Sequence, residues 1–352
     1  MNMKTISERE FIMSEINKST NYSSLMQKEA TEAGDRIGEQ LVKNKQRVEE
    51  IGRKIRDYAP HSVMFVGRGS SDHAGSFAKY LIEIETQIPT FAAAPSVATI
   101  YNRHLKLKGV LVIIISQSGR SPDILEQAKN AKKSGALCIA VLNDESSPLV
   151  DLVDYVIPLS VGEEKSVAAT KSYMATLSAI LQLVAYWKQD QELVKAIDQI
   201  PAALQKAVDS SSQLTFEYLD KVTNLVVLGR GLGFAISKEI ALKLKEVCAI
   251  HAESFSSAEF LHGPVTLVQS ALKIIDIQIN DESKKAHSLQ MKDMEVRGAK
   301  ISELHQVTQN LHPRIAPLAV LQRFYLDIEK VAIKRGLNPD EPIGLKKVTE
   351  TL

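Results

Sequence analysis

Hydroxyl and amide side chains are concentrated at residues 116–121, which read Ser-Gln-Ser-Gly-Arg-Ser. This segment follows an apolar run, residues 109–115, and precedes Pro122, so it is expected to join a buried strand to a helix. Backbone N–H groups and the helix dipole favour a bound anion at such a position. N-capping before Pro122 would require only one of the three hydroxyls. We therefore predict a phosphate site here, with simple capping as the alternative. No Gly-Lys-Ser or Gly-Lys-Thr occurs in the chain, which excludes a Walker-type loop.

Three charged residues, Glu239, Lys243 and Glu246, are spaced i, i+4 and i+7 and therefore share one face of a predicted helix. By itself this pattern is typical of a solvated salt-bridge face. Residues 251–264 add two histidines and two glutamates, and His262 precedes Gly-Pro, which predicts a turn. A turn histidine is usually a surface residue, but a carboxylate and a histidine beside a phosphate site could open a sugar ring and transfer protons.

The chain offers no recognisable metal or disulfide pattern. None of the eight histidines lies in an H-E-x-x-H or other metal-binding spacing. The two cysteines, Cys138 and Cys248, are far apart in the sequence and lie in apolar surroundings, which favours neither a disulfide framework nor a zinc site. We expect a protein without a metal.

Two glycine turns follow predicted strands at matching places. Gly-Arg-Gly occurs at 67–69 and again at 229–231, and a helix ending near an acidic residue follows each copy. The third glycine of a dinucleotide-binding G-x-G-x-x-G pattern is replaced by Asp72 and Phe234, so no nucleotide cofactor is expected. The repeat predicts one α/β domain duplicated within the chain.

The composition is that of a globular protein long enough for two domains: 352 residues, 44% hydrophobic and 24% charged. Lys plus Arg number 43 and Asp plus Glu 42, so no net charge attracts nucleic acid or an anionic membrane. The longest aliphatic run, residues 110–115, is far shorter than the roughly 20 residues that cross a bilayer. Residues 1–17 lack the apolar core of a secretory signal. These features favour a cytoplasmic enzyme.

Continuous apolar segments alternate with amphipathic ones, which predicts parallel sheets covered by helices on both faces. The expected strands are residues 63–66, 110–115, 137–142, 155–159, 224–228 and 272–279. The expected helices include residues 72–85, 122–134, 170–187, 283–298 and 318–335. We predict an N-terminal helical segment 1–50, a first domain 51–195, a helical linker 196–215, a second domain 216–335 and a tail 336–352. By itself the end of this tail, residues 344–352, would be solvated.

Seven motifs occur in the order and with the spacing of the sugar isomerase (SIS) family: Gly-x-Gly-Ser-Ser, Ser-Gln-Ser-Gly, Val167 to Lys171, Ala241 to Glu246, His251-Ala252-Glu253, Glu259 to Pro264, and the Leu-Lys-Lys-Val-Thr tail. Residues 46–352 resemble the isomerase half of glucosamine-6-phosphate synthase and, most closely, the stand-alone type II glucosamine-6-phosphate deaminases. The resemblance implies two tandem SIS domains, each a flavodoxin-like three-layer sandwich, that bind an aminosugar or ketose 6-phosphate.

The family's binding residues can be placed by matching positions. The resemblance implies that the substrate and its phosphate contact Ser71, Ser116, Gln117, Ser118, Ser121, Val167 and Lys243. One position departs from the synthase pattern, because Ala169 stands where the family has a serine hydroxyl that would touch the substrate.

The resemblance also implies three catalytic residues. Glu246 matches the glutamate that moves a proton between C1 and C2, His262 matches the ring-opening histidine, and Lys347 matches a lysine that forms a Schiff base with the ketose. A second lysine, Lys346, stands beside the expected one, so the choice of Lys347 depends on alignment. In the family the histidine is supplied by the neighbouring subunit, which implies a homodimer with a shared active site.

The direction of the expected reaction depends on ammonia. Residue 2 is Asn2, so the N-terminal cysteine of a glutaminase domain is missing from this sequence. We therefore expect deamination of glucosamine 6-phosphate to fructose 6-phosphate by ordinary side chains, without a cofactor. The alternatives are galactosamine-6-phosphate deamination, ketosamine-phosphate deglycation, aldose–ketose isomerisation, and a phosphosugar-sensing regulator without catalysis. The retention of acid, base and lysine favours an enzyme.

Overall fold

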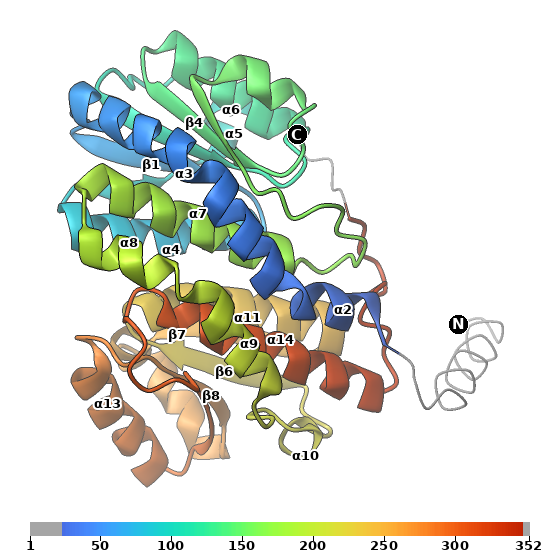
Figure 1. Ribbon diagram of the computed structural model, residues 1–352. Helices are drawn as coiled ribbons and strands as arrows, with labels where there is room; N and C mark the ends of the chain where they lie inside the picture. The colour runs from blue at the N-terminus through green and yellow to red at the C-terminus, as the bar shows by residue number, and fades with distance from the viewer. Residues whose placement is uncertain (1–22, 348–352) are drawn as a thin grey trace.

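The protein contains two parallel β-sheets with helices packed on both faces, and the computed structural model describes residues 23–347 (Figure 1). The first sheet has the strand order β2-β1-β3-β4-β5 and the second has the order β7-β6-β8-β9. All strand pairs formed by residues 23–347 are parallel. The predicted α/β fold with two parallel sheets is confirmed.

The elements of the first unit, in chain order, are β1 (Ser62–Val66), α4 (Ser70–Thr86), β2 (Thr90–Ala92), α5 (Pro95–Thr99), β3 (Val110–Ile115), α6 (Pro122–Lys133), β4 (Leu137–Leu142), η1 (Pro148–Leu152), β5 (Tyr155–Pro158) and α7 (Lys171–Lys188). Those of the second unit are α10 (Phe216–Leu219), β6 (Asn224–Gly229), α11 (Leu232–Cys248), β7 (His251–Ser256), α12 (Ser257–Phe260), η2 (Pro264–Ser270), β8 (Lys273–Gln278), α13 (Lys284–Val296), β9 (Lys300–His305) and α14 (Ala316–Lys334). The flanking helices are α2 (Leu25–Thr31), α3 (Ala33–Tyr58), α8 (Gln191–Ile197) and α9 (Ile200–Asp209).

The two ends of the predicted organisation are only partly described. Residues 1–22 of the predicted helical segment 1–50 and residues 348–352 of the predicted tail lie outside the described residues. The helix α3 continues past residue 50 to Tyr58. Residues 196–215, predicted as a linker, contribute α9, which packs on α3 and α14. The proposed domain boundaries stay a prediction.

The helices α4, α7, α11 and α14 form a layer between the two sheets (Figure 1). They pack on one another, and one continuous apolar core joins them to the inner faces of both sheets. The outer face of the first sheet is covered by α6, and α13 covers the outer face of the second. Because the two units share one core, residues from both can reach a common site.

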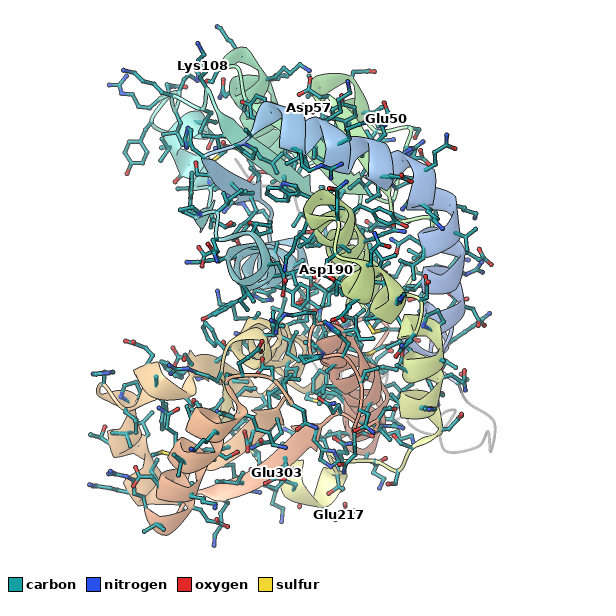
Figure 2. The ribbon with its side chains drawn as sticks, turned by 60° about the vertical axis from the view of Figure 1, so that its left-hand side comes forward. Glu50, Asp57, Lys108, Asp190, Glu217 and Glu303 are labelled. Carbon is teal, nitrogen blue, oxygen red and sulfur yellow. The ribbon has the colours of Figure 1, made fainter. Side chains whose placement is uncertain are left out.

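The long helix α3 packs along α7 with an apolar face and exposes a charged one. Ile37, Val48 and Ile55 are fully buried on the inner face. Figure 2 shows Glu50 and Asp57 on the outward side of the same helix. None of the helices formed by residues 23–347 is long and apolar enough to span a lipid bilayer.

The predicted duplication is visible in the backbone. Gly69 precedes α4 with φ 53° and ψ −128°, and Gly231 precedes α11 with φ 53° and ψ −124°. These two helices pack on each other, and the Lys238 Nζ atom donates to the Ser76 Oγ atom at 3.0 Å. Lys238 and Ser76 are separated by the same 162 residues as the two turns. The two copies therefore meet through equivalent faces.

Three strands are missing from the sequence prediction: β2, β7 and β9. Each lies at the edge of its sheet. Their burial alternates or is low, unlike the fully buried strand β3. An edge strand is covered on fewer sides and can carry polar residues, and in these three strands the apolar signal is absent from the sequence.

Candidate active site

A polar pocket of about 590 Å³ lies where the strands β1 and β3 end, at the carboxyl edge of the first sheet. Its walls also receive residues from α11 in the second unit and from the carboxy-terminal tail. Nine of the ten predicted site residues line this one pocket: Ser71, Ser116, Gln117, Ser118, Ser121, Val167, Lys243, Glu246 and Lys347. Open parallel sheets bind ligands at this edge.

The loop after β3 turns tightly so that its polar groups face the pocket. The Gly119 N–H donates to the Ser116 Oγ atom at 3.1 Å. Gly119 has φ +64°, and a Cβ atom there would lie 2.3 Å from the Ser147 Oγ atom, so only glycine fits. Ser121 occupies the N-cap position of α6, yet its side chain makes no capping hydrogen bond. Capping therefore does not account for the Ser121 hydroxyl.

Arg68 is a pocket residue that sequence reasoning did not select. Its Nε atom donates to the Asp123 Oδ2 atom at 2.8 Å, which joins the loop after β1 to the first turn of α6. The guanidinium is about half exposed and provides positive charge beside the serines. The sequence signal that could have identified Arg68 is its position between two glycines at the end of a predicted strand.

The charged face of α11 is buried, so the solvated reading of its i, i+4, i+7 spacing is wrong. The side chains of Glu239 and Lys243 have no exposed surface, because α11 lies in the helix layer against α4 and α14. The Lys243 Nζ atom lies 3.4 Å from the Glu239 Oε1 atom and also donates to the Glu246 carboxylate. Glu246 reaches the pocket with 17% of its side chain exposed.

Burial and ion pairing oppose each other in this cluster. Burial lowers the pKa of Lys243, but the Glu239 and Glu246 carboxylates outweigh it, so the pKa is raised. Burial likewise raises the pKa of Glu239, but Lys243 and His73 outweigh it and the pKa is lowered. The site therefore holds a buried ammonium between carboxylates.

The first unit contributes directly to this cluster. The Ser70 Oγ atom donates to the Glu239 Oε1 atom at 3.0 Å, and the His73 Nδ1 atom lies 3.0 Å from the Glu239 Oε2 atom. The Tyr325 hydroxyl of α14 donates to the Glu239 Oε1 atom at 3.4 Å. Sequence reasoning missed His73, because its partner lies 166 residues away and nothing local marks it.

The described part of the tail lies against the pocket. The Lys347 Nζ atom donates to the Glu164 Oε2 atom at 2.8 Å and to the Ser166 carbonyl oxygen at 2.7 Å. Lys346 lines the same pocket but is exposed to solvent. The expectation of a solvated tail end is therefore wrong at Lys347, although residues 343–346 are exposed. Glu164 is a second pocket residue that sequence reasoning missed.

His262 is the one predicted site residue that does not line this pocket. It is exposed, between α12 and η2. Its assignment to the pocket of a neighbouring subunit stays a prediction. A second cavity of about 620 Å³ lies between α13 and the strands β8 and β9 and contains none of the predicted residues. Within residues 23–347, no three His, Cys, Asp or Glu side chains are grouped to hold a metal ion.

Two parallel α/β units closing on one polar pocket, with an anion-binding loop on one side and buried charges on the other, define a duplicated α/β ligand-binding protein. More specifically, the chain belongs to the SIS domain family, which matches residues 58–186 and 218–317. The two matched segments correspond to the two units. The resemblance seen in the motifs, and the tandem arrangement, are confirmed.

Known proteins resemble this chain over most of its length. Glutamine–fructose-6-phosphate aminotransferase (isomerizing) from Sulfurisphaera tokodaii is 30% identical over 311 residues, which cover 85% of this chain and 51% of the relative. The chain spans about half the length of the curated relatives it matches. A Silicibacter pomeroyi structure, provisionally described as a phosphosugar isomerase, is 33% identical with a TM-score of 0.85 and covers 90% of this chain and 100% of that one.

A third protein shares the fold at lower identity. The glucosamine-6-phosphate deaminase from Thermotoga maritima is 22% identical with a TM-score of 0.75, over 93% of this chain and 100% of that one. This similarity shows the fold alone.

Proposed function

We propose that this chain catalyses the isomerising deamination of glucosamine 6-phosphate to fructose 6-phosphate and ammonia. One observation carries the proposal: a single pocket contains a hydroxyl-lined anion loop, a carboxylate beside a buried ammonium, and a lysine from the tail. A phosphorylated sugar offers an anion at one end and reactive carbons at the other, which matches this division of the pocket.

The phosphate would bind to the first unit. Its oxygens would accept hydrogen bonds from the serine hydroxyls and from backbone N–H groups at the start of α6. Arg68 adds positive charge at the pocket wall. The residues proposed for this contact are Ser71, Ser116, Gln117, Ser118 and Ser121. Val167 would contact the sugar from the loop between β5 and α7.

Proton transfer would use the second unit. Glu246 would take the proton from C2 of the open-chain aldose and return it to C1, giving an imine at C2. The hydrogen bond from Lys243 fixes the position of this carboxylate. Because Lys243 is itself held by Glu239, the base is mounted on a rigid buried cluster.

Ring opening and hydrolysis complete the proposed reaction. His262 does not line the pocket of its own chain. It would therefore assist ring opening in the pocket of the neighbouring subunit of a homodimer. Water would then add to the C2 imine, directly or through an imine exchanged onto Lys347, and release ammonia. One water is consumed and one ammonia leaves, so the balance is glucosamine 6-phosphate plus water to fructose 6-phosphate plus ammonia.

The two cysteines take no part in the proposed reaction. Both are buried, and burial raises the pKa of Cys138 and of Cys248 to about 12. Neither thiol is therefore suited to act as a thiolate nucleophile.

One observation favours a second candidate, another SIS activity on a related phosphosugar. Ala169 lines the pocket at the position where the synthase pattern has a serine. Loss of that hydroxyl removes a contact to the sugar, so a C4 epimer, a ketosamine phosphate or a simple aldose phosphate could be preferred. A sensor without catalysis would not need the buried charge cluster behind Glu246.

The test is ammonia release from purified protein. We expect release from glucosamine 6-phosphate to exceed that from galactosamine 6-phosphate and from the N-acetyl forms. Glu246→Gln should abolish it, whereas Glu253→Gln, an exposed control, should not. Wild-type turnover by Glu246→Gln would remove the proposed base. Saturable binding without ammonia or ketose formation would replace the enzyme by a sensor.

A further inference from the structure

Glu164 is a buried carboxylate that connects the rigid part of the pocket to the tail. It lies in the loop between β5 and α7, and its side chain has no exposed surface. On one side it accepts hydrogen bonds from the backbone N–H groups of Thr170 and Ser172, at 3.0 and 3.1 Å, and from the Ser172 hydroxyl at 2.6 Å. These donors belong to the start of α7, so the carboxylate is fixed to a long helix.

On its other side Glu164 accepts a hydrogen bond from the Lys347 ammonium at 2.8 Å. The same ammonium donates to the Ser166 carbonyl oxygen, and the Val167 N–H donates to the Asp340 carbonyl oxygen at 3.0 Å. The tail is therefore attached to one short loop at two places, near residue 340 and at residue 347.

Apolar packing between these two attachments is limited. Pro342 is buried, but Ile343 is 82% exposed and Leu345 is 40% exposed. Because little apolar surface is buried after Pro342, the contacts of the Lys347 ammonium are the main polar attachment of this end of the tail.

We propose that Glu164 is a positioning residue that places the Lys347 amine in the pocket and fastens the carboxy-terminal tail there. Its effect on turnover rests on the function proposed above, but its effect on the tail does not. Glu164 acts through Lys347 and does not itself touch the reacting carbons.

The first experiment measures how accessible the Lys347 amine is, and it does not require turnover. Purified protein is acetylated briefly with an amine-specific reagent, and tandem mass spectrometry gives the labelling rates of Lys347 and Lys346. Lys346 is exposed and adjacent, so it is an internal reference. In Glu164→Gln the Lys347 to Lys346 rate ratio should rise by roughly fivefold or more, as expected for loss of a partly buried ion pair.

The control variant carries the same Glu-to-Gln change at the neighbouring residue, Glu163. Glu163 is exposed and, within residues 23–347, its ion pair is with the exposed Lys165, so Glu163→Gln should leave the ratio unchanged. Thermal unfolding of each variant shows whether it is folded. An unchanged ratio in folded Glu164→Gln, or an equal rise in Glu163→Gln, would overturn the proposal.

The second experiment uses turnover, once ammonia release has been shown for the wild type. Glu164→Gln should lower kcat on the order of 100-fold with a much smaller change in KM, because the phosphate contacts are elsewhere. Glu164→Asp, which keeps the charge, should recover part of the rate. Adding Glu164→Gln to Lys347→Gln should cost nothing further. A further loss in the double variant would show that Glu164 does not act through Lys347. If the wild type releases no ammonia, the proposed function fails while the labelling result still stands.

Discussion

Replacing Lys243 by methionine tests the buried charge cluster most directly. Lys243 has no exposed surface and lies between the carboxylates of Glu239 and Glu246. Methionine has a similar length, so the change removes the charge with little change in volume. It leaves Glu239 buried without its main cationic partner. Removing one partner of a buried pair costs about 3 to 5 kcal/mol of unfolding free energy.

This loss can be read as a melting temperature. With an unfolding entropy of about 2 cal/mol/K per residue, a chain of this length should melt about 4 to 7 °C lower. Lys245→Met is the matched control, because Lys245 lies on the same helix and is exposed. Its unfolding free energy should change by about 0.5 kcal/mol or less. Circular dichroism melts of both variants and the wild type make the comparison.

The pH dependence supplies a second check with a definite sign. In the wild type the folded pKa of Glu239 is lowered, so its stabilising contribution is present above the unfolded pKa and lost as pH falls through the folded pKa. In Lys243→Met, burial should raise the folded pKa of Glu239, so the variant is penalised at neutral pH and relieved as pH falls. The difference in melting temperature between the wild type and Lys243→Met should therefore become smaller as the pH falls. The reasoning would be refuted if Lys243→Met melted within about a degree of Lys245→Met, or if its difference in melting temperature from the wild type grew at acid pH.

Two further predictions concern the anion loop. Ser116→Ala and Ser118→Ala should each raise KM for the phosphosugar by about tenfold or more with a smaller change in kcat, because each removes one hydrogen bond to a charged group; steady-state kinetics measure this, and equal loss in kcat would contradict it. Gly119→Ala should destabilise the fold by about 1 to 3 kcal/mol, because its Cβ would meet the Ser147 hydroxyl at a positive φ. Gly135→Ala shares the positive φ but meets no atom within 4 Å, so an equal loss there would show that backbone strain alone is responsible.

The sequence was most informative about buried strands. The strands β1, β3 and β4 agree with prediction to within one residue, because a strand covered on both faces must be continuously apolar. The edge strands β2, β7 and β9 were not predicted. Their residues meet solvent or a single neighbour, so they obey no pattern that distinguishes them from loops.

The same difference between local and long-range information applies to the pocket. The serine loop was predictable, because its residues, its strand and its helix are contiguous in the chain. The burial of Glu239 and Lys243 was not, because it depends on α4 and α14, which lie far from α11 in the sequence. Glu164 likewise has its cationic partner 183 residues away. The periodicity of a sequence shows which residues share a helix face, but it does not show which other elements cover that face.

The duplication explains why the pocket needs both units. At the 162-residue offset, Leu232 and Ala235 stand in the second copy where the first has Ser70 and His73, and Phe77 stands in the first copy where the second has Glu239. The first copy therefore supplies the hydroxyl and the imidazole of the polar contact between α4 and α11, and the second copy supplies the carboxylate. The positions that the duplication makes equivalent to these are apolar.

This asymmetry ties the register of the two units to the chemistry of the pocket. The hydrogen bonds from the first unit to Glu239 fix Lys243, and Lys243 fixes Glu246. The anion loop of the first unit and the carboxylate of the second are then held at a set separation by this buried polar contact together with the apolar core that the two units share.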